Sequence, residues 1–184
     1  MNKNVFIKYI PNMLTMINMF LGISSILILI RVDHHQKFFI VTGLILLGAV
    51  ADLFDGFAAR KLNASTNFGK QLDSYADIIT FGIAPICLIK HLAFYGHTTF
   101  ISIASMIFIA AGAYRLARHN LKDLGNYFMG LPITVAGVTL ALYSAIYTYW
   151  NFYQNPRSTV ITTLLILLLS VMMVSSKKIY RIIW

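Results

Sequence analysis

The sequence predicts an all-α integral membrane protein, a bundle of about six transmembrane helices with both termini cytoplasmic. Three observations support this fold class: 58% of the 184 residues are hydrophobic, only 11% are charged, and the mean hydropathy is +0.72. Soluble domains typically carry about 25% charged residues, so most of this surface is expected to face lipid. The length suits a single membrane domain over residues 1–184, without a separate soluble domain.

Six stretches of the chain are apolar enough to span a membrane, which takes roughly 20 mostly apolar residues. The first contains no charge, the second carries two aspartates near its end, and the third carries two more in its first half. A long uncharged stretch before Pro156 accommodates the fifth span and its connection. The predicted spans are residues 10–30, 38–59, 68–89, 98–115, 127–150 and 158–176.

The basic residues predict the orientation, because cytoplasmic loops of membrane proteins are enriched in Lys and Arg. With the N-terminus inside, eleven of the 15 Lys and Arg residues are cytoplasmic and four are external. The inner set is Lys3, Lys8, Arg60, Lys61, Lys70, Arg115, Arg118, Lys122, Lys177, Lys178 and Arg181; the outer set is Arg31, Lys37, Lys90 and Arg157. We therefore expect a bacterial-type cytoplasmic membrane, with the active site on its cytoplasmic side.

The net charge of +9 does not predict nucleic-acid binding, because the basic residues lie between apolar runs rather than on one polar face. Anionic membrane lipids and phosphate-bearing substrates are the expected partners. The single cysteine, Cys87, excludes a disulfide framework and a thiolate metal site within one chain.

The acidic residues are unusual in kind and in position. The chain has no Glu, and four of its six Asp residues fall between Asp52 and Asp77. A solvated surface would spread its carboxylates along the chain and would mix Asp with Glu. The clustering indicates a site instead.

The predicted spans bring these carboxylates together at the inner edge of the membrane. Asp52 and Asp55 lie three residues apart near the inner end of the second span, and Asp73 and Asp77 lie four apart in the third. Each pair shares one helix face, and the short connection over residues 61–67 makes the two helices neighbours. The small residues that leave space for a ligand on these faces are Gly56, Ala59 and Gly69.

Electrostatics favours a metal site over simpler explanations of the cluster. One carboxylate at the centre of a membrane helix costs about 2.5–3.5 kcal/mol, and less near the interface. Four close together also repel one another, and Arg60 alone cannot neutralise them. Helix capping, solvated interfacial charges or protonation of all four fit the clustering less well than a hard divalent cation. Mg²⁺ and Mn²⁺ suit carboxylate oxygens in a site that also holds phosphate.

The pattern Asp52-x2-Asp55-Gly56-x2-Ala59-Arg60-x8-Gly69-x3-Asp73-x3-Asp77 matches the full signature of the CDP-alcohol phosphatidyltransferase family. The chain resembles this family over essentially its whole length. The resemblance implies two ions, Mg²⁺ or Mn²⁺, held by the four aspartates and bound to the diphosphate of a CDP-linked lipid. It also implies that Asp77 takes the proton from the attacking hydroxyl, and that the protein forms a homodimer.

The resemblance further implies a set of residues that contact the CDP-lipid. Arg60 would contact phosphate or nucleotide, and Thr66 lies where the family often has a nucleotide-contacting hydroxyl. For the segment at Pro11, a helix start with an Asn or Thr cap is at least as good an explanation as nucleotide contact. The implied set is Asn12, Thr15, Gly56, Ala59, Arg60, Thr66 and Gly69.

The segment from Phe68 to Pro85 resembles the branch of the family that uses L-serine. It reads LDS-x-AD, followed by a Thr, FG and AP. Two further segments, 114–118 and 130–134, resemble the same branch, and His119 is a mild departure where that branch usually has Phe. The expected reaction transfers the phosphatidyl group of CDP-diacylglycerol to L-serine, giving phosphatidylserine and CMP.

Arg115 and Arg118 end the fourth span on the same side as the aspartates. Their guanidinium groups are suited to a lipid phosphate or to the carboxylate of serine. Ordinary membrane anchoring by positive charge on the cytoplasmic side explains the pair equally well.

Three other functions compete with serine transfer. Another member of the same family would use glycerol 3-phosphate or inositol phosphate, which need additional cationic contacts. A divalent-cation transporter would place acidic residues along a path across the membrane, whereas these gather at one depth. A metal-dependent prenyltransferase would need more spans and a second acidic motif, and the sequence contains no further acidic cluster.

Overall fold

The structure of the chain is a computed structural model that describes residues 9–32, 36–62, 64, 66–92, 98–121, 127–150, 156–175 and 178–180. Five basic residues of the predicted inner set lie outside the described residues: Lys3, Lys8, Lys122, Lys177 and Arg181.

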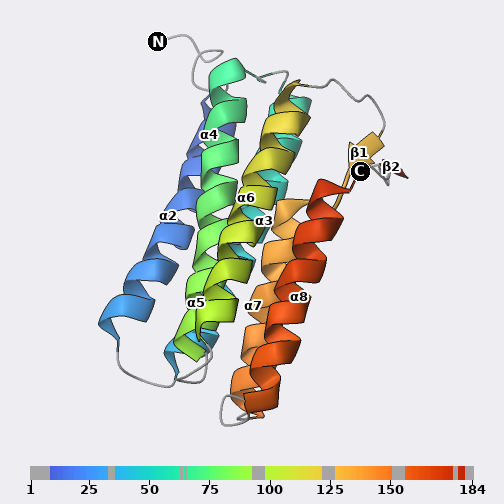
Figure 1. Cartoon of the computed structure of the whole chain (residues 1–184). Coiled ribbons are helices and arrows are strands. Elements are labelled where there is room, and N and C mark those ends of the chain that lie inside the picture. Colours follow the sequence, from blue (N-terminus) through green and yellow to red (C-terminus); the bar gives the residue numbers. More distant parts are fainter. Residues whose placement is uncertain are drawn as a thin grey trace.

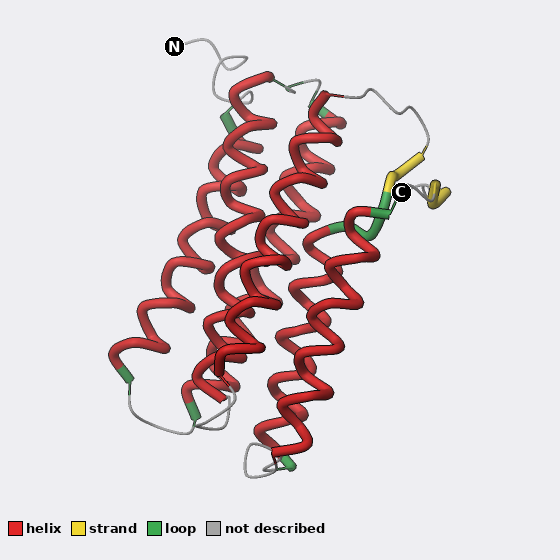
Figure 2. The backbone as a smooth tube through the Cα atoms, viewed as in Figure 1, coloured by secondary structure: helices red, strands yellow, loops and turns green. Residues whose placement is uncertain are grey.

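Long helices run side by side through the described part of the chain (Figures 1 and 2). The column Asn67–Leu92 is continuous, although a π-helix interrupts its regular α-helical bonding directly after Asp77. The helices are α2 (Ile10–Arg31), α3 (Lys37–Lys61), α4 (Asn67–Asp77), η1 (Ile78–Ile83), α5 (Ala84–Leu92), α6 (Thr98–Leu121), α7 (Ile133–Tyr149) and α8 (Pro156–Val174).

The helical fold class is confirmed. Within the described residues, four helical segments are long and apolar enough to cross a membrane, and two further apolar helices, α7 and α8, are shorter. The outward faces carry many large exposed hydrophobic side chains, including Phe20, Leu53, Met106 and Val171, whose exposed fractions are 58–71%. Such faces are expected where lipid, not water, surrounds the helices.

Two helices have bounds that differ from those of the spans predicted over the same residues. The fourth span was expected to end at residue 115, but α6 continues to Leu121 because no helix-breaking residue follows the first charge. The fifth was expected to begin at residue 127, but α7 begins at Ile133. Pro132 is its N-cap, and Gly130 has a φ of 72°, which places it in the left-handed region that helices exclude.

Two short strands precede and follow the last two helices, and the sequence did not predict them. Strand β1 (Tyr127–Met129) pairs antiparallel with β2 (Lys178–Tyr180), with Phe128 opposite Ile179. Beside this pair, the Leu131 N–H donates to the Met172 carbonyl over 3.0 Å. The start of α7 is thereby attached to the end of α8.

Packing places the amino-terminal and carboxy-terminal helices around a common core. Helix α2 packs along α3 and against α4, α3 packs on α7, and α6 packs on α8. The largest fully buried apolar side chains of this core include Ile45, Phe81, Phe108, Ile133, Leu140 and Ile166. Within the column after Asp77, the Thr80 hydroxyl of η1 donates to the Asn18 carbonyl of α2 over 2.9 Å. The π-helix is therefore held against α2.

Hydroxyl side chains inside the bundle are mostly satisfied within their own helix. Ser25, Thr42, Ser144 and Ser170 each donate to the carbonyl four residues earlier, over 2.7–2.9 Å. These bonds matter because an unpaired polar group in the membrane interior has no water to bind.

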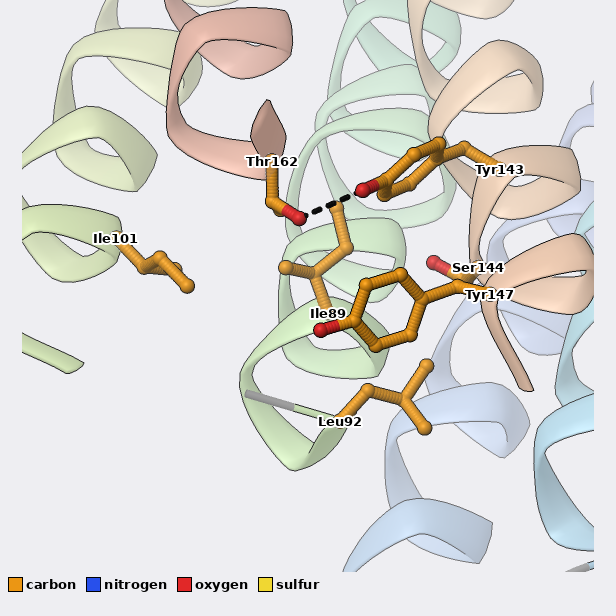
Figure 3. A pocket seen from close by; sticks show the side chains of 7 residues that line it. All are labelled: Ile89, Leu92, Ile101, Tyr143, Ser144, Tyr147 and Thr162. Atoms are coloured by element: carbon orange, nitrogen blue, oxygen red, sulfur yellow. Dashed lines mark hydrogen bonds between the residues drawn. The ribbon is translucent and has the colours of Figure 1, made fainter. Parts of the chain in front are cut away.

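A small, mainly apolar pocket lies between α5, α6, α7 and α8 (Figure 3). Tyr143 and Thr162 share a hydrogen bond of 2.7 Å across it, and Tyr147 shares one of 2.6 Å with Ser158. These two bonds join α7 to α8 away from the aspartates.

We predict that Gly48→Ala will lower the free energy of unfolding by about 1–3 kcal/mol through overpacking. An added Cβ at Gly48 would lie 2.7 Å from Thr80 Cγ2 and 2.9 Å from Asn18 Oδ1. Gly43→Ala, on the same helix, is the control, because its Cβ would meet nothing within 4 Å. Thermal and denaturant unfolding of the detergent-solubilised protein would measure both, and equal stability of the two variants would contradict the packing described.

Candidate metal centre and adjoining cleft

Three of the four predicted aspartates converge at one point. Asp52 and Asp55 lie on α3 and Asp73 lies on α4, and one carboxylate oxygen from each lies within 4.8 Å of the others. Asp77 stands outside this group of three, at the end of α4, and its charged neighbours are the other three aspartates and Arg115. The spacing of the residues along two helices joined by a short connection therefore brings the carboxylates together, as the sequence predicts.

The carboxylates have the chemistry of a divalent-cation site. Asp55 and Asp77 are buried, with 5% and 6% of their surfaces exposed. The Oδ1 atoms of Asp73 and Asp77 are buried and have no hydrogen-bond partner among the described residues. Buried anionic oxygens that lack donors and face one another are costly unless a cation lies among them. Hard cations such as Mg²⁺ and Mn²⁺ prefer this all-oxygen set of ligands.

Threonine hydroxyls from two other helices hold the α3 aspartates. Thr15 of α2 lies 2.8 Å from Asp55 Oδ2, and its hydroxyl also lies 3.0 Å from the Pro11 carbonyl. Thr134 of α7 donates to Asp52 Oδ2 over 3.1 Å. Thr15 was predicted to contact the CDP-lipid, and its hydroxyl bonds the Asp55 carboxylate. The contact of Thr134 with Asp52 was missed, because sequence alone does not place the fifth span beside the second.

A cleft opens beside Asp55 and Asp73, between α2, α3 and α4. Thr66 caps α4 at its rim, where its hydroxyl accepts from the Gly69 N–H over 3.0 Å. Six of the residues predicted to contact CDP-lipid line this cleft: Asn12, Thr15, Gly56, Ala59, Thr66 and Gly69. Pro11, Ala64 and Lys70 also line it and were not predicted to do so.

The remaining predicted contact, Arg60, does not line the cleft and is exposed. Its Nη1 atom lies 3.6 Å from the position that a Cβ of Gly56 would occupy. Since Gly56 lines the cleft, the Arg60 guanidinium lies next to the cleft wall.

The two arginines of α6 are placed differently from one another. Arg115 is buried, with 6% of its surface exposed, and its charged neighbours include Asp77 and Asp52. Within the described part of the chain, its Nε has no hydrogen-bond partner. Arg118 donates to the carbonyls of Val174 and Ser175 over 3.1 and 3.2 Å, at the end of α8. Arg115 therefore lies near two of the carboxylates, whereas the Arg118 guanidinium bonds the end of α8.

The fold and the site define a class of protein: a helical membrane protein with buried, converging carboxylates beside a cleft. A sequence model of the family described as CDP-alcohol phosphatidyltransferase matches residues 8–176. The chain belongs to the CDP-alcohol phosphatidyltransferase family.

Relatives in three organisms carry names that specify an acceptor. The chain is 37% identical over 142 residues to a CDP-diacylglycerol–serine O-phosphatidyltransferase of Bacillus subtilis, covering 76% of this chain and 77% of the relative. It is 32% identical over 169 residues to a protein of the same name in Methanocaldococcus jannaschii, covering 92% and 72%. It is 35% identical over 177 residues to an archaetidylserine synthase of Methanothermobacter thermautotrophicus, covering 94% and 70%.

Proposed function

We propose that the protein transfers the phosphatidyl group of CDP-diacylglycerol to the hydroxyl of L-serine, giving phosphatidylserine and CMP. The observation that carries this proposal is the convergence of the Asp52, Asp55 and Asp73 carboxylates beside a cleft. Family membership and the names of the relatives support the reaction and the acceptor.

The four aspartates would hold two divalent ions, Mg²⁺ or Mn²⁺, with Asp52, Asp55 and Asp73 as the converging ligands and Asp77 beside them. When bound, the ions supply positive charge that neutralises the diphosphate and stabilises CMP as it leaves. The unpartnered Oδ1 atoms of Asp73 and Asp77 support this assignment.

The cleft would hold the CDP portion of the lipid substrate. Asn12 and Thr66 offer hydrogen-bonding side chains at its wall, and Lys70 offers a positive charge. Arg60, next to Gly56, would add a second positive charge for a phosphate or the nucleotide. The absence of side chains at Gly56 and Gly69 leaves the cleft open along both helices.

Asp77 would act as the base in the transfer step. The serine hydroxyl oxygen forms a bond to the phosphorus that carries diacylglycerol, the bond from that phosphorus to the CMP oxygen breaks, and the hydroxyl proton passes to Asp77. Burial of Asp77 among the other three aspartates and Arg115 supports this role.

Arg115 would bind the carboxylate of serine. It is buried near Asp77 and Asp52, and its Nε lacks a partner in the part of the chain that the structure describes. A buried guanidinium with an unused donor is well suited to a carboxylate. Arg118 was predicted for the same role, but its bonds to the end of α8 favour a structural contribution.

The predicted membrane arrangement is part of the proposal. The chain would cross a bacterial-type cytoplasmic membrane six times, with both termini and the aspartates on the cytoplasmic side. The first described helix begins and the last one ends toward the same end of the bundle, which supports an even number of crossings (Figure 1). Assembly as a homodimer stays a prediction, and the mass of the detergent-solubilised complex would test it.

The acceptor is tested by CMP release from CDP-diacylglycerol with purified protein and Mg²⁺ or Mn²⁺. We expect release that depends on L-serine and yields phosphatidylserine. Glycerol 3-phosphate and inositol phosphate are the control acceptors, and turnover on either of them without turnover on serine would refute the assignment.

We predict that Asp77→Asn will lower kcat by at least about 100-fold, because general-base catalysis contributes 10²–10⁴-fold. Binding of CDP-diacylglycerol should persist, since three converging carboxylates remain. Asp52→Asn is the comparison, and it should instead raise the metal concentration needed for half-maximal rate. Near-normal turnover by Asp77→Asn would show that another group accepts the proton.

We predict that Arg115→Gln will raise the KM for serine by at least about tenfold, because a charge-assisted hydrogen bond contributes about 1.5–3 kcal/mol. The KM for CDP-diacylglycerol should change little. Arg118→Gln is the matched variant one turn along α6, and it should reduce thermal stability without a comparable rise in the KM for serine. A larger rise with Arg118→Gln would reverse the assignment of the two arginines.

A further inference from the structure

Asp52 and Asp55 lie on the same helix, but each accepts a hydrogen bond from a different neighbouring helix. The Thr15 hydroxyl of α2 lies 2.8 Å from Asp55, and Thr134 of α7 donates to Asp52 over 3.1 Å. In each case the threonine hydroxyl bonds the Oδ2 atom of the carboxylate. The chain therefore fixes one side of each carboxylate.

The position of Thr134 is itself tightly determined. It is the second residue of α7, directly after the Pro132 N-cap and Ile133, which is fully buried. Upstream, Gly130 adopts a φ of 72°, and a Cβ there would collide with the Met173 carbonyl. Leu131 is bonded to Met172 over 3.0 Å. The segment directly before α7 therefore packs against the last turn of α8.

Arg118 extends this support to α6. Its guanidinium donates to the Val174 and Ser175 carbonyls over 3.1 and 3.2 Å, on the same segment that contacts Gly130. A series of contacts thus runs from α6, through the end of α8 and the start of α7, to the Asp52 carboxylate. The N-terminal end of α7 also carries the positive end of a helix dipole, which favours a nearby anion.

We propose that Thr134 is a positioning residue that holds the Asp52 carboxylate in the orientation needed to bind a divalent cation. The proposal rests on the metal site of the proposed function and adds a residue from a helix that carries none of the aspartates. Groups that orient a metal ligand commonly affect metal affinity by about 10–100-fold. A hydroxyl that only filled space would have no such effect.

The test measures direct Mn²⁺ binding to the purified, detergent-solubilised protein. The electron paramagnetic resonance signal of free Mn²⁺ reports how much of the metal stays unbound. Thr134→Val removes the hydroxyl while it keeps the shape, and we expect Mn²⁺ affinity to fall about tenfold. Thr134→Ser restores a hydroxyl and should recover most of the affinity. Thr139→Val is the control on the same helix, because the Thr139 hydroxyl bonds only the Val135 carbonyl among the contacts described, over 2.8 Å.

Unchanged Mn²⁺ affinity in Thr134→Val, or equal losses in Thr134→Val and Thr134→Ser, would overturn the inference. Thermal unfolding of each variant checks that a loss of affinity does not reflect a loss of fold. The proposed function is judged separately, by serine-dependent CMP release from the wild-type protein. Weaker Mn²⁺ binding by Thr134→Val in a protein without that activity would support the inference and refute the function.

Discussion

Mutual repulsion among four carboxylates inside an apolar helical bundle is the constraint on which the rest of this structure depends. Asp55 and Asp77 are almost fully buried, and Asp52 and Asp73 are partly buried beside them. Such an arrangement is unfavourable unless opposite charge lies close by. Arg115 provides one protein cation in the field of Asp77 and Asp52. The unpartnered oxygens of Asp73 and Asp77 identify where further positive charge is needed.

The helices around the carboxylates are arranged to meet that constraint from several directions. Helix α2 brings Thr15 to Asp55, α7 brings Thr134 to Asp52, and α6 brings Arg115 toward Asp77. The cleft opens beside Asp55 and Asp73, whereas Arg115 and Thr134 lie toward Asp77 and Asp52. This division suits a reaction in which a nucleotide-linked lipid and an acceptor approach the same carboxylates.

Much of this site could be predicted from the sequence, because its main residues lie at helical spacing on two consecutive helices. Asp52, Asp55 and Asp73 converge for that reason, and small residues on the same faces line the cleft. The contact between Thr134 and Asp52 and the bonds from Arg118 to the end of α8 were not predictable, since both depend on how distant helices pack. The strand pair and the late start of α7 depend on the backbone of Gly130, whose φ of 72° no composition reveals.

The most direct test of the central claim is a structure of the purified protein determined with Mn²⁺, in which anomalous scattering locates the metal. We expect Mn²⁺ bonded to carboxylate oxygens of Asp52, Asp55 and Asp73, at the point where these oxygens lie within 4.8 Å of one another. A carboxylate cluster that stays free of metal at saturating Mn²⁺, with the ion elsewhere, would contradict it.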